Sequence, residues 1–163
     1  MKDLVIRTMQ KSDCEIIAQA RGKLASQYEG YLTEQTIGER TVLVAERRGT
    51  LLGYITIVWE AGHEPFRAQG IPEIGDFNVF GGRRQGVGTA LIEEAERRMA
   101  RVVDAAGVGV GLTPEYGPAQ RLYAKRGFVP DGRGIWYNDH YVKLGDTVVV
   151  DHGLILWQTK TLR

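Results

Sequence analysis

The chain has 163 residues, a length at which one domain can bury a sizeable core without disulfides or metal ions. Hydrophobic residues make up 43% and charged residues 25% of the chain, which excludes a disordered protein. Lys and Arg total 21 against 20 Asp and Glu, so the net charge of +1 gives no general attraction to nucleic acid. We therefore expect one folded domain over residues 1–163 with no nucleic-acid partner.

The numbers and positions of cysteine and histidine further narrow the class of protein. Cys14 is the only cysteine, so no intramolecular disulfide forms, as is usual in a reducing compartment. His63, His140 and His152 are far apart and lack the spacing of metal ligands, so no metal site is expected. The start of the chain does not resemble a signal peptide, and no apolar run has the length of a membrane span. These features predict a cytoplasmic protein with no membrane partner.

The first half of the chain predicts two helices and three strands. Residues 4–8 predict a strand, after which Ser12 or Asp13 caps a helix that Gly22 ends. A second helical stretch is expected at about residues 31–39. The β-branched runs that follow predict a hairpin and then a long loop: residues 41–47 and 51–59 around Arg48-Gly49-Thr50, and residues 60–72.

The middle of the chain predicts a strand, a glycine-rich loop and an amphipathic helix. The strand covers residues 74–80, and the helix begins at Thr89 and is stopped by Gly107. One face of this helix is apolar, at Leu91, Ile92, Ala95, Met99 and Val102. The opposite face carries the expected ion pairs Glu93–Arg97 and Glu94–Arg98.

The last third predicts strands on either side of a short helix. Valines alternate with Gly109 and Gly111, which predicts a strand whose backbone another group approaches closely. A helix over residues 118–126 ends at Gly127, and extended segments follow from Phe128, over 136–150 and over 154–158. This order predicts an α/β fold with a mixed central β-sheet of about six to seven strands, flanked by helices on both faces.

The loop at residues 83–89, Arg-Arg-Gln-Gly-Val-Gly-Thr, combines three features of an anion site. The start of a helix leaves backbone N–H groups unpaired and carries a favourable dipole. Gly86 and Gly88 lack the Cβ atoms that would keep a pyrophosphate away from these donors. Arg83 and Arg84 bring guanidinium groups that suit phosphate oxygens. Taken alone, the same residues are equally typical of an ordinary turn with two solvated arginines.

Two common nucleotide motifs fail at this loop. A dinucleotide fingerprint needs Gly or Ala where Leu91 stands, and a P-loop needs Lys where Val87 stands. A nucleotide-binding protein of either kind is therefore not expected.

A second motif, Ala-Gln-Arg-Leu-Tyr-Ala-Lys-Arg-Gly-Phe at residues 119–128, follows the loop after one helix and one strand. With both motifs in view, the chain resembles the GNAT acetyltransferase superfamily. Residues 83–88 are similar to its R/Q-x-x-G-x-G/A loop, and residues 119–128 to its A-x-x-L-Y-x-K-x-G-F motif. Residues 76–79, Asp-Phe-Asn-Val, are similar to the D-L-x-V end of the family's central strand. The chain departs from the family in having Tyr116 where Asn is common.

The resemblance implies a cosubstrate and the residues that bind it. Acetyl-coenzyme A is the implied cosubstrate, and its acetyl group moves to an amine by direct attack in a ternary complex. Main-chain groups of the strand end hydrogen-bond to the acetyl and pantetheine parts. The expected cofactor contacts are Phe77, Asn78, Val79, Arg83, Arg84, Gln85, Gly86, Val87, Gly88, Thr89 and Lys125.

Transfer to an amine needs a base for the ammonium proton and an acid for the departing thiolate. Tyr123 is the candidate acid, since a phenol with a pKa of about 10 is protonated at neutral pH. Glu73 and Asp76 are the candidate bases, and their separation places them on opposite faces of a regular strand. The N–H of Val79 is the candidate donor to the carbonyl oxygen. A structural role is the alternative for each of the three side chains.

Two functions stay open from the sequence. The first is an N-acetyltransferase that uses a small-molecule or peptide amine as acceptor, with a homodimer as a common assembly in the family that it resembles. The second is a non-catalytic acyl-CoA-binding sensor or interaction module. Release of thiol from acetyl-CoA in the presence of amines distinguishes the two.

Overall fold

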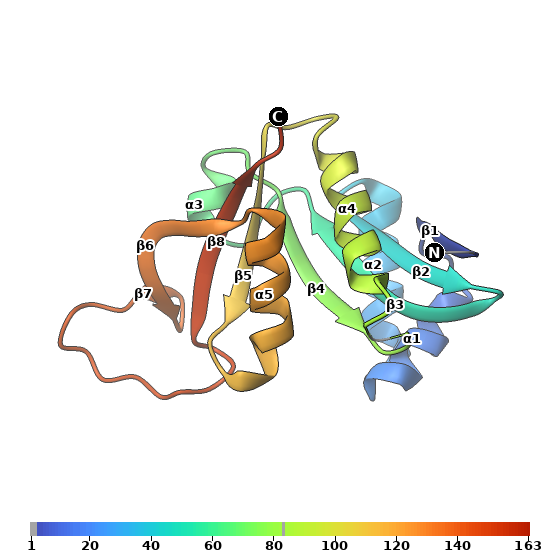
Figure 1. Ribbon diagram of the computed structural model, residues 1–163, viewed down its shortest axis with the longest axis horizontal. Coiled ribbons are helices and arrows are strands. Elements are labelled where there is room, and N and C mark those ends of the chain that lie inside the picture. The colour runs from blue at the N-terminus through green and yellow to red at the C-terminus, as the bar shows by residue number, and fades with distance from the viewer. Residues whose placement is uncertain (1–2, 83) are drawn as a thin grey trace.

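The computed structural model describes residues 3–82 and 84–163 and contains one mixed, eight-stranded sheet with helices on both faces (Figure 1). The strand order is β1-β2-β3-β4-β5-β8-β6-β7. The α/β class and the mixed sheet are thus confirmed, with slightly more strands than predicted. Arg83, one of the expected cofactor contacts, lies outside the described residues.

The elements follow the order expected from the sequence. The strands are β1 (Leu4–Thr8), β2 (Arg40–Arg47), β3 (Thr50–Val58), β4 (Glu73–Val79), β5 (Ala105–Gly111), β6 (Val129–Tyr137), β7 (His140–Tyr141) and β8 (Ile155–Thr161). The helices are α1 (Asp13–Arg21), α2 (Ala25–Ile37), α3 (Glu64–Arg67), α4 (Val87–Met99) and α5 (Gly117–Arg126), with a 3-10 turn at Pro114–Tyr116. The second helix is longer than expected, and the loop before β4 contains the short helix α3.

Two hydrophobic layers enclose the sheet. Helices α4 and α5 cover one face, where Leu91, Ile92 and Tyr123 join the buried cluster formed with Ile55 and Val108. Helices α1 and α2 cover the other face over β2 and β3. Helix α3 packs on that second face over β5 and β8, where Phe66 meets Trp157. Figure 1 shows α4 and α5 in front of the sheet and the other helices behind it.

The sheet opens between β4 and β5. These two strands run parallel and pair only at Glu73–Gly107 and Ile74–Val108. Beyond that point they diverge toward their carboxyl ends (Figure 1). Because the ladder between β4 and β5 ends at Ile74, the residues after Ile74 on the β5 side of β4 have no strand partner among the described residues. This gap positions the candidate site.

Three details of the helix after the glycine loop differ from expectation. It begins at Val87 rather than Thr89 and ends at Met99, so Gly107 does not stop it but lies within β5. Val102 is 68% exposed and is not on the apolar face, because the helix ends before it. Glu94 binds both Arg97 and Arg98, whereas Glu93 pairs with Arg126 of α5. The expected pair Glu93–Arg97 was therefore wrong.

The close approach expected at the glycines of β5 comes from the protein's own aromatic rings. A Cβ atom built on Gly107 would lie 2.3 Å from the ring of Phe66. The corresponding distances are 2.7 Å from Trp157 at Gly109 and 2.4 Å from Tyr116 at Gly111. The alternating glycines therefore make room for aromatic rings that pack on one face of β5.

Gly107→Ala is expected to lower the free energy of unfolding by about 1–3 kcal/mol, since the added methyl group overlaps a buried ring. Gly30→Ala is the matched control, because Gly30 lies within α2 and a Cβ atom built there would have no other atom within 4 Å. In a helix this change is expected to raise the free energy of unfolding by roughly 0.5–1 kcal/mol. Urea unfolding of both variants measures these changes, and equal stabilities would contradict the packing argument.

Candidate functional site

The start of α4 presents backbone N–H groups that have no hydrogen-bond partner among the described residues. Gly86 is the residue before the helix, has φ 78°, and offers no side chain to cap it. The first bond of the helix runs from the Ala90 N–H to the Gly86 carbonyl at 2.9 Å. The N–H groups of Val87, Gly88 and Thr89 precede that bond and have no partner within the helix. With the positive end of the helix dipole, they suit an anionic ligand.

The glycine loop also brings β4, α4 and α5 together. A Cβ atom built on Gly88 would lie 3.5 Å from Phe77 and Val79 and 3.7 Å from Leu122. The exposed Arg84 has φ 62°, and the Gln85 side chain accepts a hydrogen bond of 2.6 Å from Arg47. The carboxyl end of β4 is thereby placed directly beside the start of α4.

A β-bulge interrupts β4 at Asp76. Thr56 of β3 pairs with Gly75 and Tyr54 pairs with Asn78, so three steps along β4 match two along β3. Asp76 has φ 25°, a value that side-chain-bearing residues rarely adopt. A bulge of this kind inserts one residue and reverses the alternation of the strand beyond it.

The bulge changes where the two carboxylates lie. Glu73 is opposite Val58, on the face of the sheet away from α4, since the neighbouring Ile74 joins the α4 core. The Asp76 side chain bonds to Tyr31 of α2, which covers that same face. The expectation that the two acids lie on opposite faces was therefore wrong, because it assumed a regular strand.

The bulge also turns the Val79 N–H toward the gap between β4 and β5. Phe80 donates to the Leu52 carbonyl at 3.0 Å, which makes this a hydrogen-bonded pair. Such pairs alternate with non-bonded pairs in an antiparallel ladder, so the Gly53–Val79 pair is non-bonded. The N–H and carbonyl of Val79 therefore face away from β3 and toward the open side.

Asp76 accepts hydrogen bonds from three side chains. Its Oδ2 atom accepts from the hydroxyls of Tyr54 at 2.7 Å and Tyr31 at 3.0 Å. Its Oδ1 atom accepts from Nδ2 of Asn78 at 2.8 Å. The buried hydroxyls of Tyr54 and Tyr28 lie 3.4 Å apart. Both oxygens of Asp76 are thus occupied by groups of the protein.

The Glu73 carboxylate accepts fewer hydrogen bonds than the Asp76 carboxylate. Its Oε2 atom lies 3.5 Å from the backbone nitrogen of His63, which donates to it. Burial raises the pKa of the Glu73 carboxyl above its usual value, while the N–H groups of His63 and Gly62 and the charge of Arg40 act in the opposite direction. A carboxylate with a raised pKa is a better proton acceptor.

Tyr123 lies on the buried side of α5 at 5% exposure. Its ring is 6.4 Å from that of Phe77 and 5.8 Å from that of Phe128. Burial raises the pKa of its hydroxyl above that of free tyrosine. Among the described residues, none forms a hydrogen bond with that hydroxyl, so the phenol stays protonated and free to donate.

Lys125 is the one expected cofactor contact that lies on α5. It is exposed in the last turn of α5, next to Arg126, which pairs with Glu93 and Glu96. Those acids are two to three turns beyond the start of α4. Lys125 itself forms no hydrogen bond or ion pair among the described residues, and its contact with a cofactor stays a prediction.

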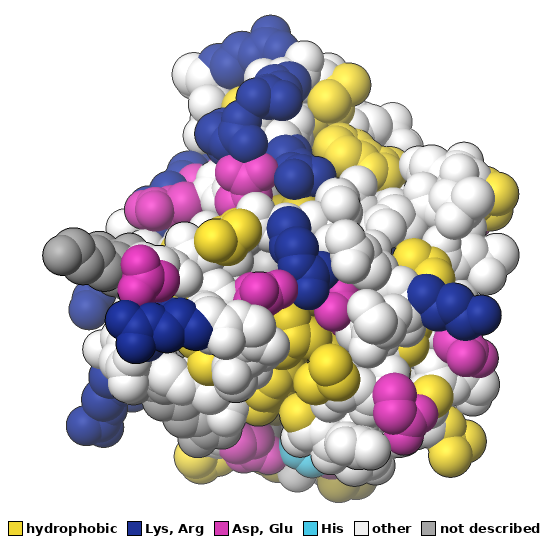
Figure 2. Space-filling model, turned by 90° about the vertical axis from the view of Figure 1, so that its right-hand side faces the viewer, with side chains coloured by type: hydrophobic (Ala, Val, Ile, Leu, Met, Phe, Trp, Pro, Cys, Tyr) yellow, Lys and Arg dark blue, Asp and Glu magenta, His cyan; other side chains and the backbone are white. Residues whose placement is uncertain are grey.

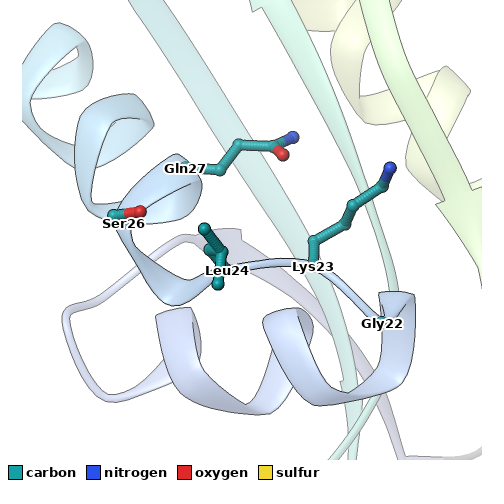
Figure 3. A pocket seen from close by; sticks show the side chains of 5 residues that line it. All are labelled: Gly22, Lys23, Leu24, Ser26 and Gln27. Carbon is teal, nitrogen blue, oxygen red and sulfur yellow. The ribbon is translucent and has the colours of Figure 1, made fainter.

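An open depression lies at the junction of α1 and α2, on the face that carries both carboxylates. Figure 3 shows the side chains of Lys23 and Gln27 extending on the same side of this junction, which Gly22, Leu24 and Ser26 also line. Nε2 of Gln27 donates to the Tyr31 hydroxyl at 3.3 Å, and that hydroxyl donates to Asp76. A chain of hydrogen bonds thus joins the depression to the β4 bulge.

Charges elsewhere are mixed. Figure 2 shows acidic and basic side chains interspersed on the side where β1 and the β2–β3 hairpin lie. Arg7 there binds Asp13 and Glu46, and Arg48 binds Asp3.

None of the described helices is both long and apolar enough to cross a bilayer. Within residues 3–82 and 84–163, no group of three or more His, Cys, Asp or Glu side chains is placed to hold a metal ion.

These features define an α/β protein with a mixed sheet that opens between two parallel strands, beside an uncapped, glycine-rich helix start. The chain belongs to the GNAT acetyltransferase family, since the model of the acetyltransferase (GNAT) domain matches residues 38–130. The matched segment includes β4, the glycine loop, α4 and α5. No curated protein sequence matches the chain significantly.

Solved structures share the fold at low sequence identity. A putative acetyltransferase from Salmonella typhimurium, solved with its cofactor acetyl-CoA, is 18% identical with a TM-score of 0.73, over 99% of this chain and 95% of that one. An N-acetyltransferase from Staphylococcus aureus Mu50 is 14% identical with a TM-score of 0.74, over 99% and 100%. The spermidine N-acetyltransferase from Vibrio cholerae, in complex with CoA and spermine, is 14% identical with a TM-score of 0.70, over 99% and 97%.

The hydrogen bonds of Tyr31 and Tyr54 to Asp76 are a feature of the site that the sequence did not reveal. Tyr54 lies in an ordinary apolar strand, and Tyr31 lies near the middle of α2, 45 positions from Asp76. No local spacing connects them. A partial signal was present in the Asp-Phe-Asn-Val segment, where two polar residues interrupt a buried strand.

Proposed function

We propose that this protein transfers an acetyl group from acetyl-CoA to the primary amine of a small molecule or peptide, within a ternary complex. The observation that carries the proposal is the uncapped start of α4 beside the open edge of β4. A helix start without a side-chain cap suits a pyrophosphate, and an unpaired strand edge suits an amide-bearing arm. Acetyl-CoA supplies an activated thioester, and the remaining chemistry belongs to side chains of the protein.

The residues that would hold acetyl-CoA fit its chemistry. The N–H groups of Val87, Gly88 and Thr89 would bind the diphosphate, with Arg84 adding positive charge. The main chain of β4 at Phe77, Asn78 and Val79 would bond to the pantetheine arm and orient it. The Val79 N–H, which faces the gap, would donate to the thioester carbonyl oxygen.

Glu73 is the better of the two candidate bases. It is half-buried, and the raised pKa of its carboxyl favours proton uptake from an ammonium group through bridging water, since Glu73 lies six positions before Val79 on β4. Asp76 already accepts three hydrogen bonds from side chains and has less capacity for a further proton.

Tyr123 would act as the acid for the departing sulfur. Its raised pKa keeps the hydroxyl protonated over the neutral range, so the phenol can donate a hydrogen bond or a proton to the thiolate. Its burial beside Phe77 would also exclude water from the thioester.

The acceptor would approach from the face of Glu73, where the α1–α2 depression lies. The names of solved relatives include spermidine N-acetyltransferase and ribosomal-protein-alanine N-acetyltransferase. A panel of polyamines, amino acids and peptides with free amino termini therefore includes the kinds of acceptor that these two names give.

Thiol release from acetyl-CoA across that panel, together with calorimetric binding of CoA, tests the proposal. Turnover with at least one amine and micromolar binding support it. Binding without turnover across the panel would instead favour the non-catalytic acyl-CoA-binding module. Absence of CoA binding would contradict both.

The double variant Arg84→Glu/Gly86→Asp is expected to raise the dissociation constant for CoA by roughly tenfold or more, because two carboxylates would face the diphosphate. Arg48→Glu is the matched control, since Arg48 is another exposed arginine with positive φ, at the turn between β2 and β3. Isothermal titration with CoA measures the effect. Equal affinities in the double variant and the control would argue strongly against the anion site.

A further inference from the structure

The β4 bulge decides which main-chain donor reaches the thioester. Before the bulge, Thr56 pairs with Gly75, and regular pairing from there would set Val79 opposite Leu52. Leu52 directs its carbonyl at β4, where it accepts from Phe80 and Gly81. Without the extra residue, the Val79 N–H would therefore turn toward β3 and form a hydrogen bond with that strand, so it could not reach a ligand.

The backbone does not hold this bulge unaided. Asp76 has positive φ without being glycine, a conformation that persists only where surrounding contacts enforce it. The contacts present are the three hydrogen bonds to its carboxylate, from Tyr54 on β3, Tyr31 on α2 and Asn78 on β4 itself. They hold the bulge from the opposite strand, from the covering helix and from the residue that follows it.

The hydrogen bonds are arranged across the inserted residue. Asn78 is the first residue that pairs again with β3, opposite Tyr54, and its Nδ2 atom also lies 3.3 Å from the Tyr54 hydroxyl. Asp76, Asn78 and Tyr54 thus form a closed triangle of polar contacts over the bulge. Tyr31 adds a fourth corner from α2, and the Arg40 guanidinium lies 4.2 Å from the centre of its ring.

We propose that Asp76 is a positioning residue, whose carboxylate clamps the β4 bulge through Tyr31, Tyr54 and Asn78 and thereby aims the Val79 N–H at the thioester carbonyl. The inference rests on the proposed acetyl transfer and assigns the proton-accepting role to Glu73 alone. It also gives the tyrosines a function in catalysis, although neither touches the reacting atoms.

Three variants test the clamp: Asp76→Asn, Tyr31→Phe and Tyr54→Phe. Asp76→Asn is expected to lower kcat by about 10²-fold, the usual cost of misplacing one donor to the carbonyl oxygen. The dissociation constant for CoA should rise by less than kcat falls, because the pantetheine contacts of β4 depend on the bulge but the diphosphate donors on α4 do not. Asp146→Asn and Thr33→Val are the matched controls, since the first neutralises an exposed carboxylate that accepts a hydrogen bond and the second removes an exposed donor, both away from the bulge.

The pH profile separates a clamp from a base. If Asp76 positions the bulge, Asp76→Asn keeps the acid limb of kcat/KM at the pH of the wild type, at a lower rate. Loss of that limb in Asp76→Asn would overturn the proposal, because it would make Asp76 the proton acceptor. Tyr31→Phe and Tyr54→Phe should lower kcat, and each should add less than about twofold in the Asp76→Asn background, since all three act through one clamp.

Amide hydrogen exchange gives a readout that does not depend on turnover. The N–H groups of Asn78 and Phe80, which lie at the rejoined part of the ladder, should exchange faster in all three variants than in either control. Unchanged exchange and unchanged kcat in Tyr31→Phe and Tyr54→Phe would overturn the proposal, even if Asp76→Asn fails to fold. A wild type that binds CoA without turnover would refute the proposed function, and exchange at Asn78 and Phe80 would still decide the clamp.

Discussion

Tyr123→Phe is expected to lower kcat by about 10²-fold or more, the usual contribution of a positioned acid. The affinity for CoA should remain close to that of the wild type, because only a hydroxyl is removed from a residue that packs mainly through its ring. The thiolate then leaves without a proton donor, and its charge develops in a buried, apolar environment.

The measurement compares steady-state kcat with the dissociation constant for CoA. Tyr137→Phe is the matched control, since it removes a tyrosine hydroxyl that donates to Asp151 at 3.1 Å on an exposed loop. A Tyr123→Phe enzyme with the rate of the control would remove this hydroxyl from the mechanism. A large loss of CoA affinity with kcat unchanged would assign Tyr123 a packing role instead.

Glu73→Gln is expected to lower kcat/KM by roughly 10²–10⁴-fold at neutral pH, the usual range for loss of a general base. The base must be ionised to act, so wild-type activity falls as pH drops through the pKa of Glu73. Because burial raises that pKa above the ordinary value of 4.5, the acid limb should lie at a higher pH than an exposed glutamate would give. The residual activity of Glu73→Gln should lack this limb.

A pH series of kcat/KM with a fixed amine measures both effects. Glu64→Gln is the matched control, since it removes a negative charge from the exposed surface of α3 on the same face of the sheet. If Glu73→Gln retained the acid limb of the wild type, another group would be the base. The same profile for Asp76→Asn then shows whether the second carboxylate takes that role.

Glu73 and Asp76 show why the alternation of a regular strand led to a wrong prediction. Glu73 and Asp76 are three positions apart, and in a regular strand that spacing places them on opposite faces. The bulge inserts one residue between Gly75 and Asn78 and brings both acids to the same face. Bulges are set by pairing with a distant strand, so a period of two in one segment cannot reveal them.

The acidic helix pairs show a similar limit at smaller scale. Glu93 and Arg97 have the spacing of a favourable pair, yet Glu93 binds Arg126, 33 positions away, and Arg97 binds Glu94. The spacing of residues along one helix shows which side chains are close enough to form an ion pair. Which pairs actually form also depends on the charged side chains of a neighbouring helix.

Local sequence is enough to predict the parts of this protein that depend on short-range chemistry. Helix ends at Gly22 and Gly127, the hairpin turn and the glycine loop all follow from local backbone freedom and hydrogen bonding, so nearby residues suffice to predict them. The bulge at Asp76, its hydrogen bonds to two tyrosines and the direction of the Val79 N–H could be found only in the folded chain. Those features arise where β3, β4 and α2 meet, and contact between segments far apart in the chain depends on the packing of the whole sheet.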